Sequence, residues 1–164
     1  VDMYAHRPFT ALLWSGVFEK HPKLKMVFTE TGCGWILETL RVLKFKIDNP
    51  IFAHFMKDLS LTPEEYFQRN CYIVASSLAP HEIGSRHNIG VDKMMWGSDY
   101  HHMEGTWPNT EHKLRETFHD VEEGEIRNML GENAIDVFGF DRTLMEKTAA
   151  RIGRQISAIK QPVD

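Results

Sequence analysis

Apolar and polar positions along the chain follow two periods, one typical of helices and one typical of buried strands. Apolar side chains at three- and four-residue spacing predict amphipathic helices. The predicted helices cover residues 8–20, 35–47, a segment from 62 onward, 80–87, 110–118, 120–138 and 144–159. Short apolar runs bounded by turn residues predict buried strands at residues 25–30, 71–75 and 93–97. Strands that alternate with helices indicate an α/β fold with a parallel sheet, and the continuously apolar strands predict that both sheet faces are buried.

Local signals predict where several of these helices begin and end. Pro8 is expected in the first turn of its helix. Thr62-Pro63-Glu64-Glu65 is a capping box, and Asp120 to Glu123 resembles a second one. Gly139 is expected to close the helix before it.

Composition and charge exclude several classes of protein. The 164 residues suit a single domain, with 42% hydrophobic and 26% charged residues, so the chain is expected to be globular. A net charge of −4 without a basic run excludes the electrostatic footprint of a nucleic-acid or anionic-membrane binder. Cys33 and Cys71 lie far apart without a C-x-x-C motif, which excludes a disulfide framework and a zinc ribbon. The sequence leaves one bridge between them open, but we expect reduced thiols and a cytoplasmic location.

Polar residues follow each predicted strand and mark a candidate site. They are Glu30, the serines at 76 and 77, and Asp99. Ligands of parallel α/β folds bind at the carboxyl ends of strands, so these side chains are expected to share one site. Asp99 is either a metal ligand or an aspartate of a tight turn, and its spacing does not separate the two. Taken alone, Glu30 is better explained as a cap for the helix that begins near Trp35.

The residues after Asp99 extend this candidate site. His101 and His102 are adjacent and point in different directions, so at most one is expected to face the site. Trp107 follows the Gly105 loop and is the tryptophan that we place near a substrate, whereas the other three are expected to serve the core. No P-loop, G-x-S-x-G or dinucleotide motif is present.

The run Gly97-Ser-Asp-Tyr-His-His-Met-Glu-Gly-Thr-Trp-Pro108 resembles the strand-eight motif of the amidohydrolase-2 family. These are metal-dependent TIM-barrel enzymes related to aminocarboxymuconate semialdehyde decarboxylase. Further matches cover nearly the whole chain in the family's order. They lie at residues 15–19, 21–25, 29–35, 66–70, 90–93, 131–134 and 139–141.

The resemblance implies roles for the strand-end residues. Asp99 corresponds to the aspartate that binds the catalytic metal, and it is also implied as a catalytic residue. Glu30 lies near the position of a ligand histidine in many relatives, so it is implied to bind metal, to carry a proton, or to position its neighbours. His102 corresponds to the usual histidine of the motif, and with Trp107 it is implied to bind substrate. His101 replaces the family's usual proline. Zinc is the expected metal, with manganese or iron as alternatives.

Other family motifs are missing from this chain. The H-x-H metal motif of strand one and the ligand histidine of strand five do not occur, and a closed barrel needs about 200 residues or more. The three predicted strands match strands six to eight, so residues 1–164 are expected to form the C-terminal part of one barrel, with 141–164 as a helical extension. Because the chain begins at Val1, we expect an upstream segment to have been removed. The piece would then need its N-terminal part, a swapped partner or an oligomer.

Three functions remain open at this point. The leading hypothesis is a metal-dependent hydrolase that activates water for attack on a carbonyl-type substrate. A metal-dependent non-oxidative decarboxylase of the same fold is the second. The third is a non-catalytic fragment with an incomplete metal site, which would leave the parent protein active and this chain alone inactive.

Overall fold

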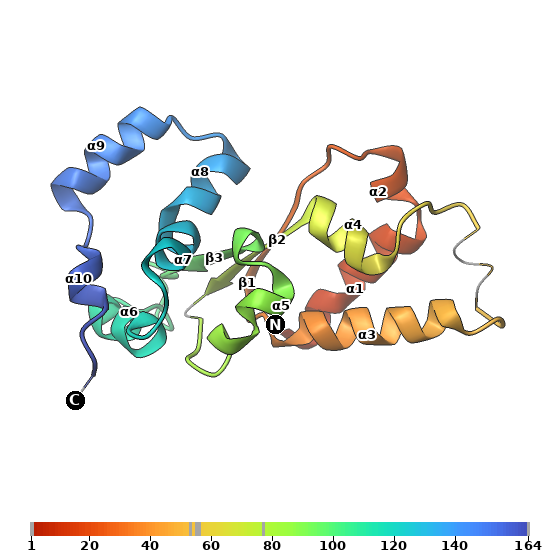
Figure 1. Cartoon of the computed structure of the whole chain (residues 1–164), viewed down its shortest axis with the longest axis horizontal. Helices are drawn as coiled ribbons and strands as arrows, with labels where there is room; N and C mark the ends of the chain where they lie inside the picture. The colour runs from red at the N-terminus through yellow and green to blue at the C-terminus, as the bar shows by residue number, and fades with distance from the viewer. Residues whose placement is uncertain (1, 53, 55–56, 77, 164) are drawn as a thin grey trace.

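A three-stranded parallel sheet lies at the centre of the chain (Figure 1). The computed structural model describes residues 2–52, 54, 57–76 and 78–163. The strands are β1 (Met26–Thr31), β2 (Cys71–Ser76) and β3 (Met94–Gly97), and they lie side by side in that order. The parallel α/β arrangement predicted from the sequence is therefore confirmed.

Helices lie on both sides of this sheet in the view of Figure 1. Before β3 they are α1 (Asp2–Trp14), α2 (Val17–Lys20), α3 (Gly34–Asp48), α4 (Pro63–Asn70), η2 (Ile83–Ser85), α5 (Arg86–Ile89) and η3 (Val91–Lys93). After β3 they are α6 (Thr110–Phe118), α7 (Glu123–Arg127), the π-helical η4 (Asn128–Glu132), α8 (Asn133–Phe138), α9 (Arg142–Ile152) and α10 (Ile156–Ile159). Among the described residues, every helix is too short or too polar to cross a lipid bilayer.

Aromatic side chains form the centre of the core between helices and sheet. Phe9 of α1 packs against Phe18, Phe28 and Phe67, with ring centroids 6.3, 6.4 and 5.8 Å away. Phe28 is 5% exposed and the other three rings 1% or less. Full burial of such a side chain contributes about 1.5–3 kcal/mol, so this cluster fixes α1, α2 and α4 onto β1.

The two faces of the sheet are covered unequally, contrary to the sequence prediction. In β2, Cys71, Ile73 and Ala75 are completely buried, whereas the alternate residues Tyr72 and Val74 are half-buried. Because side chains alternate across a strand, one face packs under helices while the other is only partly covered. The apolar run predicted burial correctly for one face, and the second face presents the surface that would line a barrel interior.

The first predicted helix has different ends from those expected. It begins at Asp2 rather than Pro8, so Pro8 lies inside α1. It also breaks before Lys20, because Gly16 adopts a left-handed backbone with φ of 71°. That conformation costs glycine little and ends α1 before α2 begins.

The C-terminal helical segments also differ from the prediction. The expected helix over 144–159 is interrupted at Gly153, which separates α9 from α10. The cap of α7 is Glu122, whose side chain accepts from the Glu125 N–H, rather than Asp120. The capping box of Thr62 and Glu65 and the left-handed Gly139 after α8 are confirmed.

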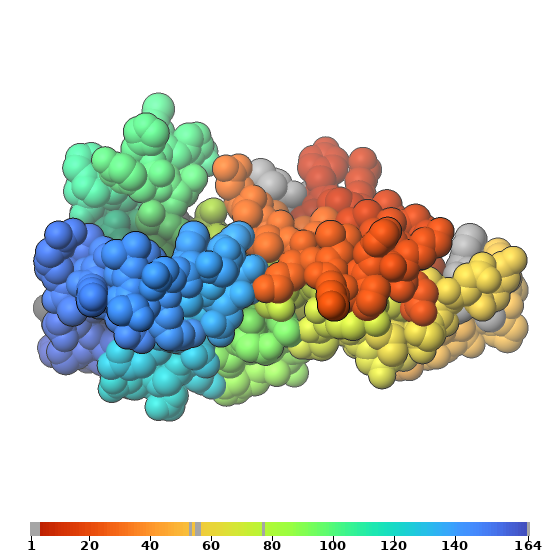
Figure 2. Space-filling view, turned by 90° about the horizontal axis from the view of Figure 1, so that it is seen from above, coloured from red at the N-terminus to blue at the C-terminus, as the bar shows by residue number. Residues whose placement is uncertain are grey.

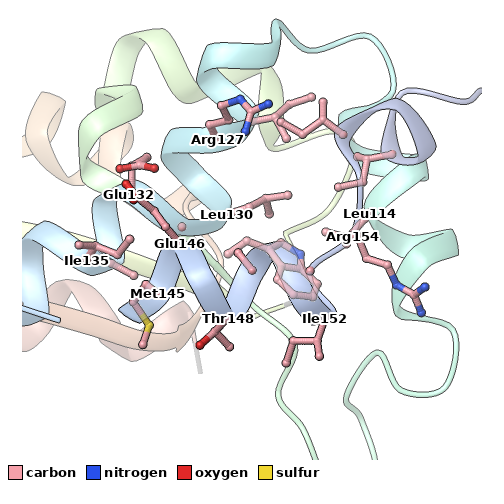
Figure 3. A pocket seen from close by; sticks show the side chains of 18 of the residues that line it. Leu114, Arg127, Leu130, Glu132, Ile135, Met145, Glu146, Thr148, Ile152 and Arg154 are labelled. Atoms are coloured by element: carbon pink, nitrogen blue, oxygen red, sulfur yellow. The ribbon is translucent and has the colours of Figure 1, made fainter. Parts of the chain in front are cut away.

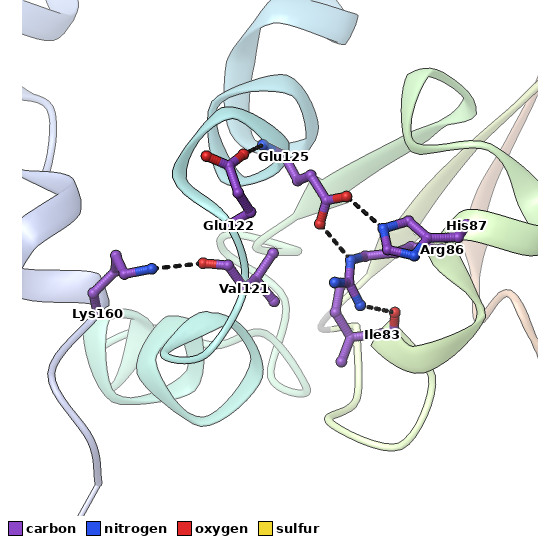
Figure 4. A network of polar contacts seen from close by, with 7 residues as sticks. All are labelled: Ile83, Arg86, His87, Val121, Glu122, Glu125 and Lys160. Carbon is purple, nitrogen blue, oxygen red and sulfur yellow. Dashed lines mark hydrogen bonds and ion pairs between the residues drawn. The ribbon is translucent and has the colours of Figure 1, made fainter.

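A polar network joins α5 to α7 around Glu125 (Figure 4). Arg86 Nε donates to the Glu125 carboxylate at 2.7 Å, and His87 Nε2 contacts its other oxygen. The hydrogen bond from Arg86, helped by His87, lowers the pKa of Glu125 below its usual 4.5. The ionised carboxylate is therefore the form that stabilises this packing.

We expect Glu125→Gln to lower the free energy of unfolding at pH 7. A carboxyl whose pKa is lower in the folded than in the unfolded protein stabilises the fold at pH values above its unfolded pKa. This stabilisation is lost as the pH falls through the pKa of the folded state. The difference between wild type and Glu125→Gln should therefore shrink below about pH 4.5. Urea unfolding from pH 3 to pH 7 measures it. Glu123→Gln, which breaks only an exposed pair with Arg127, serves as the control and should change little.

Candidate active site

The carboxyl ends of the three strands meet at one edge of the sheet, where the sequence placed the candidate site. Because the strands are parallel and β2 lies between β1 and β3, Glu30 and Asp99 emerge on the same edge, separated by one strand. The strands that carry the two residues are two strand spacings apart, which is about 9–10 Å. Ser76 ends β2 between them, and Ser77 lies outside the described residues.

Asp99 follows β3 in a conformation that few residues adopt. Its φ is 53°, in the left-handed region, which aspartate tolerates better than most residues. The segment after it folds back, since the Thr106 N–H donates to the Ser98 carbonyl at 2.9 Å. The His102 N–H also donates to the Asp99 carbonyl at 2.8 Å. These bonds hold the Asp99 side chain at the strand end.

His102 is the histidine of the adjacent pair that contacts Asp99. Its Nδ1 lies 3.0 Å from Asp99 Oδ2, and the Asp99 side chain is 23% exposed against 63% for His102. The ring of His101 instead lies 5.5 Å from that of Tyr100. An imidazole beside a carboxylate orients that carboxylate. The imidazole can also exchange a proton with a bound molecule.

Glu30 lies at a bulge near the end of β1. Thr29 pairs with Val74 and Thr31 with Ala75, so Glu30 is the extra residue between them. It is exposed and has a φ of 55°. Among the described residues, Glu30 and Asp99 are the two non-glycine residues with positive φ. Bulges and left-handed residues recur at functional sites because they redirect a side chain at a cost in backbone energy.

The explanation of Glu30 as a helix cap is wrong. The carboxylate at the start of α3 belongs to Glu82, whose Oε1 accepts from the backbone N–H groups of Cys33 and Gly34 at 2.8 and 3.2 Å. A carboxylate in this position satisfies backbone donors that the helix leaves unpaired. The Glu30 side chain is therefore not needed for the cap.

We expect Glu30→Gly to raise the free energy of unfolding by about 0.5–1 kcal/mol. A left-handed backbone costs a side-chain-bearing residue about 1–2 kcal/mol, and the greater freedom of unfolded glycine offsets part of the gain. Glu30→Gln keeps the strain and should leave stability unchanged. Chemical denaturation of both variants tests this, and equal stability of Glu30→Gly and Glu30→Gln would contradict it.

Trp107 and Tyr100 form an exposed aromatic pair beside Asp99. Each is 69% exposed, and their rings meet edge to face with centroids 6.2 Å apart. Figure 2 shows the segment around residue 100, coloured green, standing out from the body of the molecule. Trp107 was expected near a substrate, whereas Tyr100 had no predicted role, although its place directly after Asp99 is a signal for one.

The described residues do not by themselves form the metal site that the sequence implied. No three histidine, cysteine, aspartate or glutamate side chains among them converge as metal ligands. A structural or catalytic zinc needs three or four protein ligands. Asp99 and Glu30 both have the chemistry of such a ligand, and they lie at the same edge of the sheet.

The cysteines do not contribute to this edge. Cys33 and Cys71 are both buried and neither forms a disulfide, as expected for reduced thiols. Burial raises the pKa of the Cys71 thiol to about 12, which leaves it protonated at neutral pH.

Solved structures share this fold, and two of them match most of the chain. An amidohydrolase from Mycobacterium avium subsp. paratuberculosis K-10 matches 84% of the chain at 28% identity, with a TM-score of 0.68. The 5-carboxyvanillate decarboxylase LigW from Sphingomonas paucimobilis matches 79% at 25% identity, with a TM-score of 0.65. The chain spans only 34% and 38% of these two proteins.

The family comparison agrees with the structural one. The chain corresponds to part of a TIM barrel, as its motifs implied. No curated protein matches it. The model of the amidohydrolase family matches residues 1–140. The chain therefore belongs to the amidohydrolase family.

Proposed function

We propose that this chain supplies one edge of the active site of a metal-dependent amidohydrolase-type hydrolase. The observation that carries the proposal is the pair of strained carboxylates, Glu30 and Asp99, at the carboxyl ends of parallel strands. Strain that no packing requirement explains is a mark of functional sites. Family membership supports an enzyme of this class.

Each residue of the edge has a proposed role. Asp99 is a metal ligand, and His102 holds its carboxylate through the 3.0 Å contact and faces the substrate. Glu30 exchanges a proton with the substrate or its attacking water, while Trp107 packs against the substrate. A divalent metal held by Asp99, zinc by default, with manganese or iron as alternatives, would lower the pKa of water and polarise a carbonyl when bound. Its other ligands come from a further part of the barrel, on a longer polypeptide or a second copy.

Decarboxylation is the second candidate. The similarity to LigW, a decarboxylase, favours it. Both reactions use the same strand-end carboxylates, so the residues do not separate them. A non-catalytic role is the third, since the described residues hold an incomplete ligand set.

Product analysis of the assembled enzyme tests the proposed reaction. By assembled enzyme we mean this chain together with whatever polypeptide or copy completes its ligand set. Amides, esters and aromatic carboxylates would be supplied as substrates. Hydrolysis products support the hydrolase, whereas carbon dioxide release assigns the decarboxylase. Asp99→Asn should lower turnover by about 10³-fold or more, since it removes a charged group required for the reaction. Unchanged turnover in Asp99→Asn would refute the proposed role of this edge.

A further inference from the structure

An apolar hollow of about 540 Å³ lies beneath α9 (Figure 3), and none of its lining residues belongs to the strand-end site. One wall comes from β3 and the helices after it, through Trp96, Leu114, Ile126, Leu130 and other residues. The opposite wall is the inner side of α9, with Met145, Thr148, Ala149 and Ile152. Its volume is in the range of small-molecule sites, which are mostly apolar with a few polar groups at defined places.

Helix α9 does not pack closely against the helices that follow β3. None of its residues is buried, and Ile152 is 70% exposed although it faces the hollow. Exposed ion pairs lie at both ends of the segment. Arg142 pairs with Asp136 at 2.9 Å and with Glu132, and Arg154 pairs with Glu111 at 3.3 Å. An apolar wall that remains in solvent costs free energy, which an apolar ligand between the two walls would recover.

The hollow is formed jointly by the family fold and by residues beyond it. The family match ends at residue 140, and α9 begins at Arg142. The strand-end carboxylates emerge from the edge of the sheet. Trp96 pairs with Ala75, so its side chain lies on the sheet face that packs under helices. A ligand bound here would therefore occupy a second place on the molecule.

Charge differs between the two ends of the hollow. Glu132 and Glu146 lie at one end in Figure 3, and Arg154 lies at the other beside Ile152. Arg127 lines the rim as well and is paired with Glu123 at 2.7 Å. The pair between Arg154 and Glu111 is exposed, and a guanidinium has five N–H donors, so Arg154 can hold a second carboxylate. Glu132 is neutralised by its pair with Arg142, so Glu146 is the carboxylate that disfavours an anion at that end. An anionic ligand would therefore direct its charge toward Arg154.

We propose that this hollow binds a monocarboxylic acid with an unbranched alkyl chain. The alkyl chain lies between Trp96 and Ile152, and the carboxylate contacts Arg154. The proposal is independent of the reaction at the strand ends.

Calorimetric titration of the chain with dodecanoate and with dodecanol tests this proposal. We expect one dodecanoate per chain and weaker binding of dodecanol, which lacks the charge. Ala149→Trp places a large side chain in the hollow and should abolish binding of both. Ala150→Trp on the same exposed helix does not line the hollow and should leave binding unchanged.

The role of Arg154 has its own matched pair of variants. Arg154→Gln should weaken dodecanoate binding about tenfold, as expected for the loss of a charge-assisted hydrogen bond, and leave dodecanol unaffected. Arg151→Gln, outside the hollow, should change neither. Absence of dodecanoate binding, or binding that survives Ala149→Trp, would overturn the site. Equal affinities of Arg154→Gln and wild type for dodecanoate would overturn the assignment of the carboxylate.

Discussion

Phe9→Ala is expected to lower the free energy of unfolding by about 3–5 kcal/mol. Phe9 is completely buried and its ring contacts those of Phe18, Phe28 and Phe67. Removing it takes apolar area out of the core and leaves a cavity between α1 and the sheet that the surrounding rings can only partly fill. Since small domains are stable by only about 5–15 kcal/mol, the loss is a large fraction of the total.

Urea denaturation with Phe45→Ala as the control measures this effect. Phe45 is also a phenylalanine on a helix, but it is 65% exposed. Its replacement should change stability by less than about 0.5 kcal/mol. Similar losses in the two variants would contradict the position of the aromatic core.

Gly105→Ala should lower stability by about 1–3 kcal/mol and displace Asp99 at the same time. A Cβ at position 105 would lie 2.5 Å from the Asp99 carbonyl oxygen and 3.0 Å from the His102 carbonyl oxygen. Both neighbours are backbone atoms that hydrogen bonds hold in place, so neither can move without altering the turn. The Asp99–His102 contact should therefore be lost with the turn.

Gly131→Ala is the matched control for this prediction. A Cβ at Gly131 would meet no atom within 4 Å, and the residue lies in the helical segment η4. Alanine is favoured over glycine in helices by about 1 kcal/mol, so this variant should be more stable than wild type. The NMR chemical shifts of the His102 ring report its contact with Asp99 and should change in Gly105→Ala alone. Unchanged chemical shifts of the His102 ring in Gly105→Ala would contradict the close packing of the turn against Asp99.

Local patterns were sufficient to predict the strands and several helix ends. The apolar runs at 25–30, 71–75 and 93–97 identified β1, β2 and β3, and the spacing of Thr62 and Glu65 identified the cap of α4. These features depend on residues close in sequence. The interruptions at Gly16 and Gly153 were missed because the apolar spacing continues across both glycines.

Features that depend on distant residues were not predictable in this way. Glu82 caps α3 from 49 residues away, which no local capping pattern reveals. The bulge that lifts Glu30 out of its strand exists only through the register between β1 and β2. The contact between Asp99 and His102 spans three residues, and it lies within the motif from Gly97 to Pro108. Apart from Asp99, no metal ligand could be assigned from a local motif of this kind.

The hollow under α9 was missed for a different reason. The stripe of Leu144, Thr148 and Ile152 has the helical spacing of a buried face, and the pattern predicts burial from spacing alone. In the structure Leu144 and Ile152 are 55% and 70% exposed. The ends of α9 form ion pairs with α8 and α6, and the spacing of the stripe gives no sign of these distant partners.

Metal content of the assembled enzyme, measured by mass spectrometry beside an Asp99→Asn variant, tests the proposed active site most directly. Asparagine keeps the size of Asp99 and tolerates its left-handed backbone, so the variant removes the charge with little change of fold. Asp92→Asn, at an exposed carboxylate that pairs with Lys93, is the control. Our account predicts about one zinc, manganese or iron ion per chain in wild type and Asp92→Asn, and loss of that ion in Asp99→Asn. Full metal content in Asp99→Asn would contradict it.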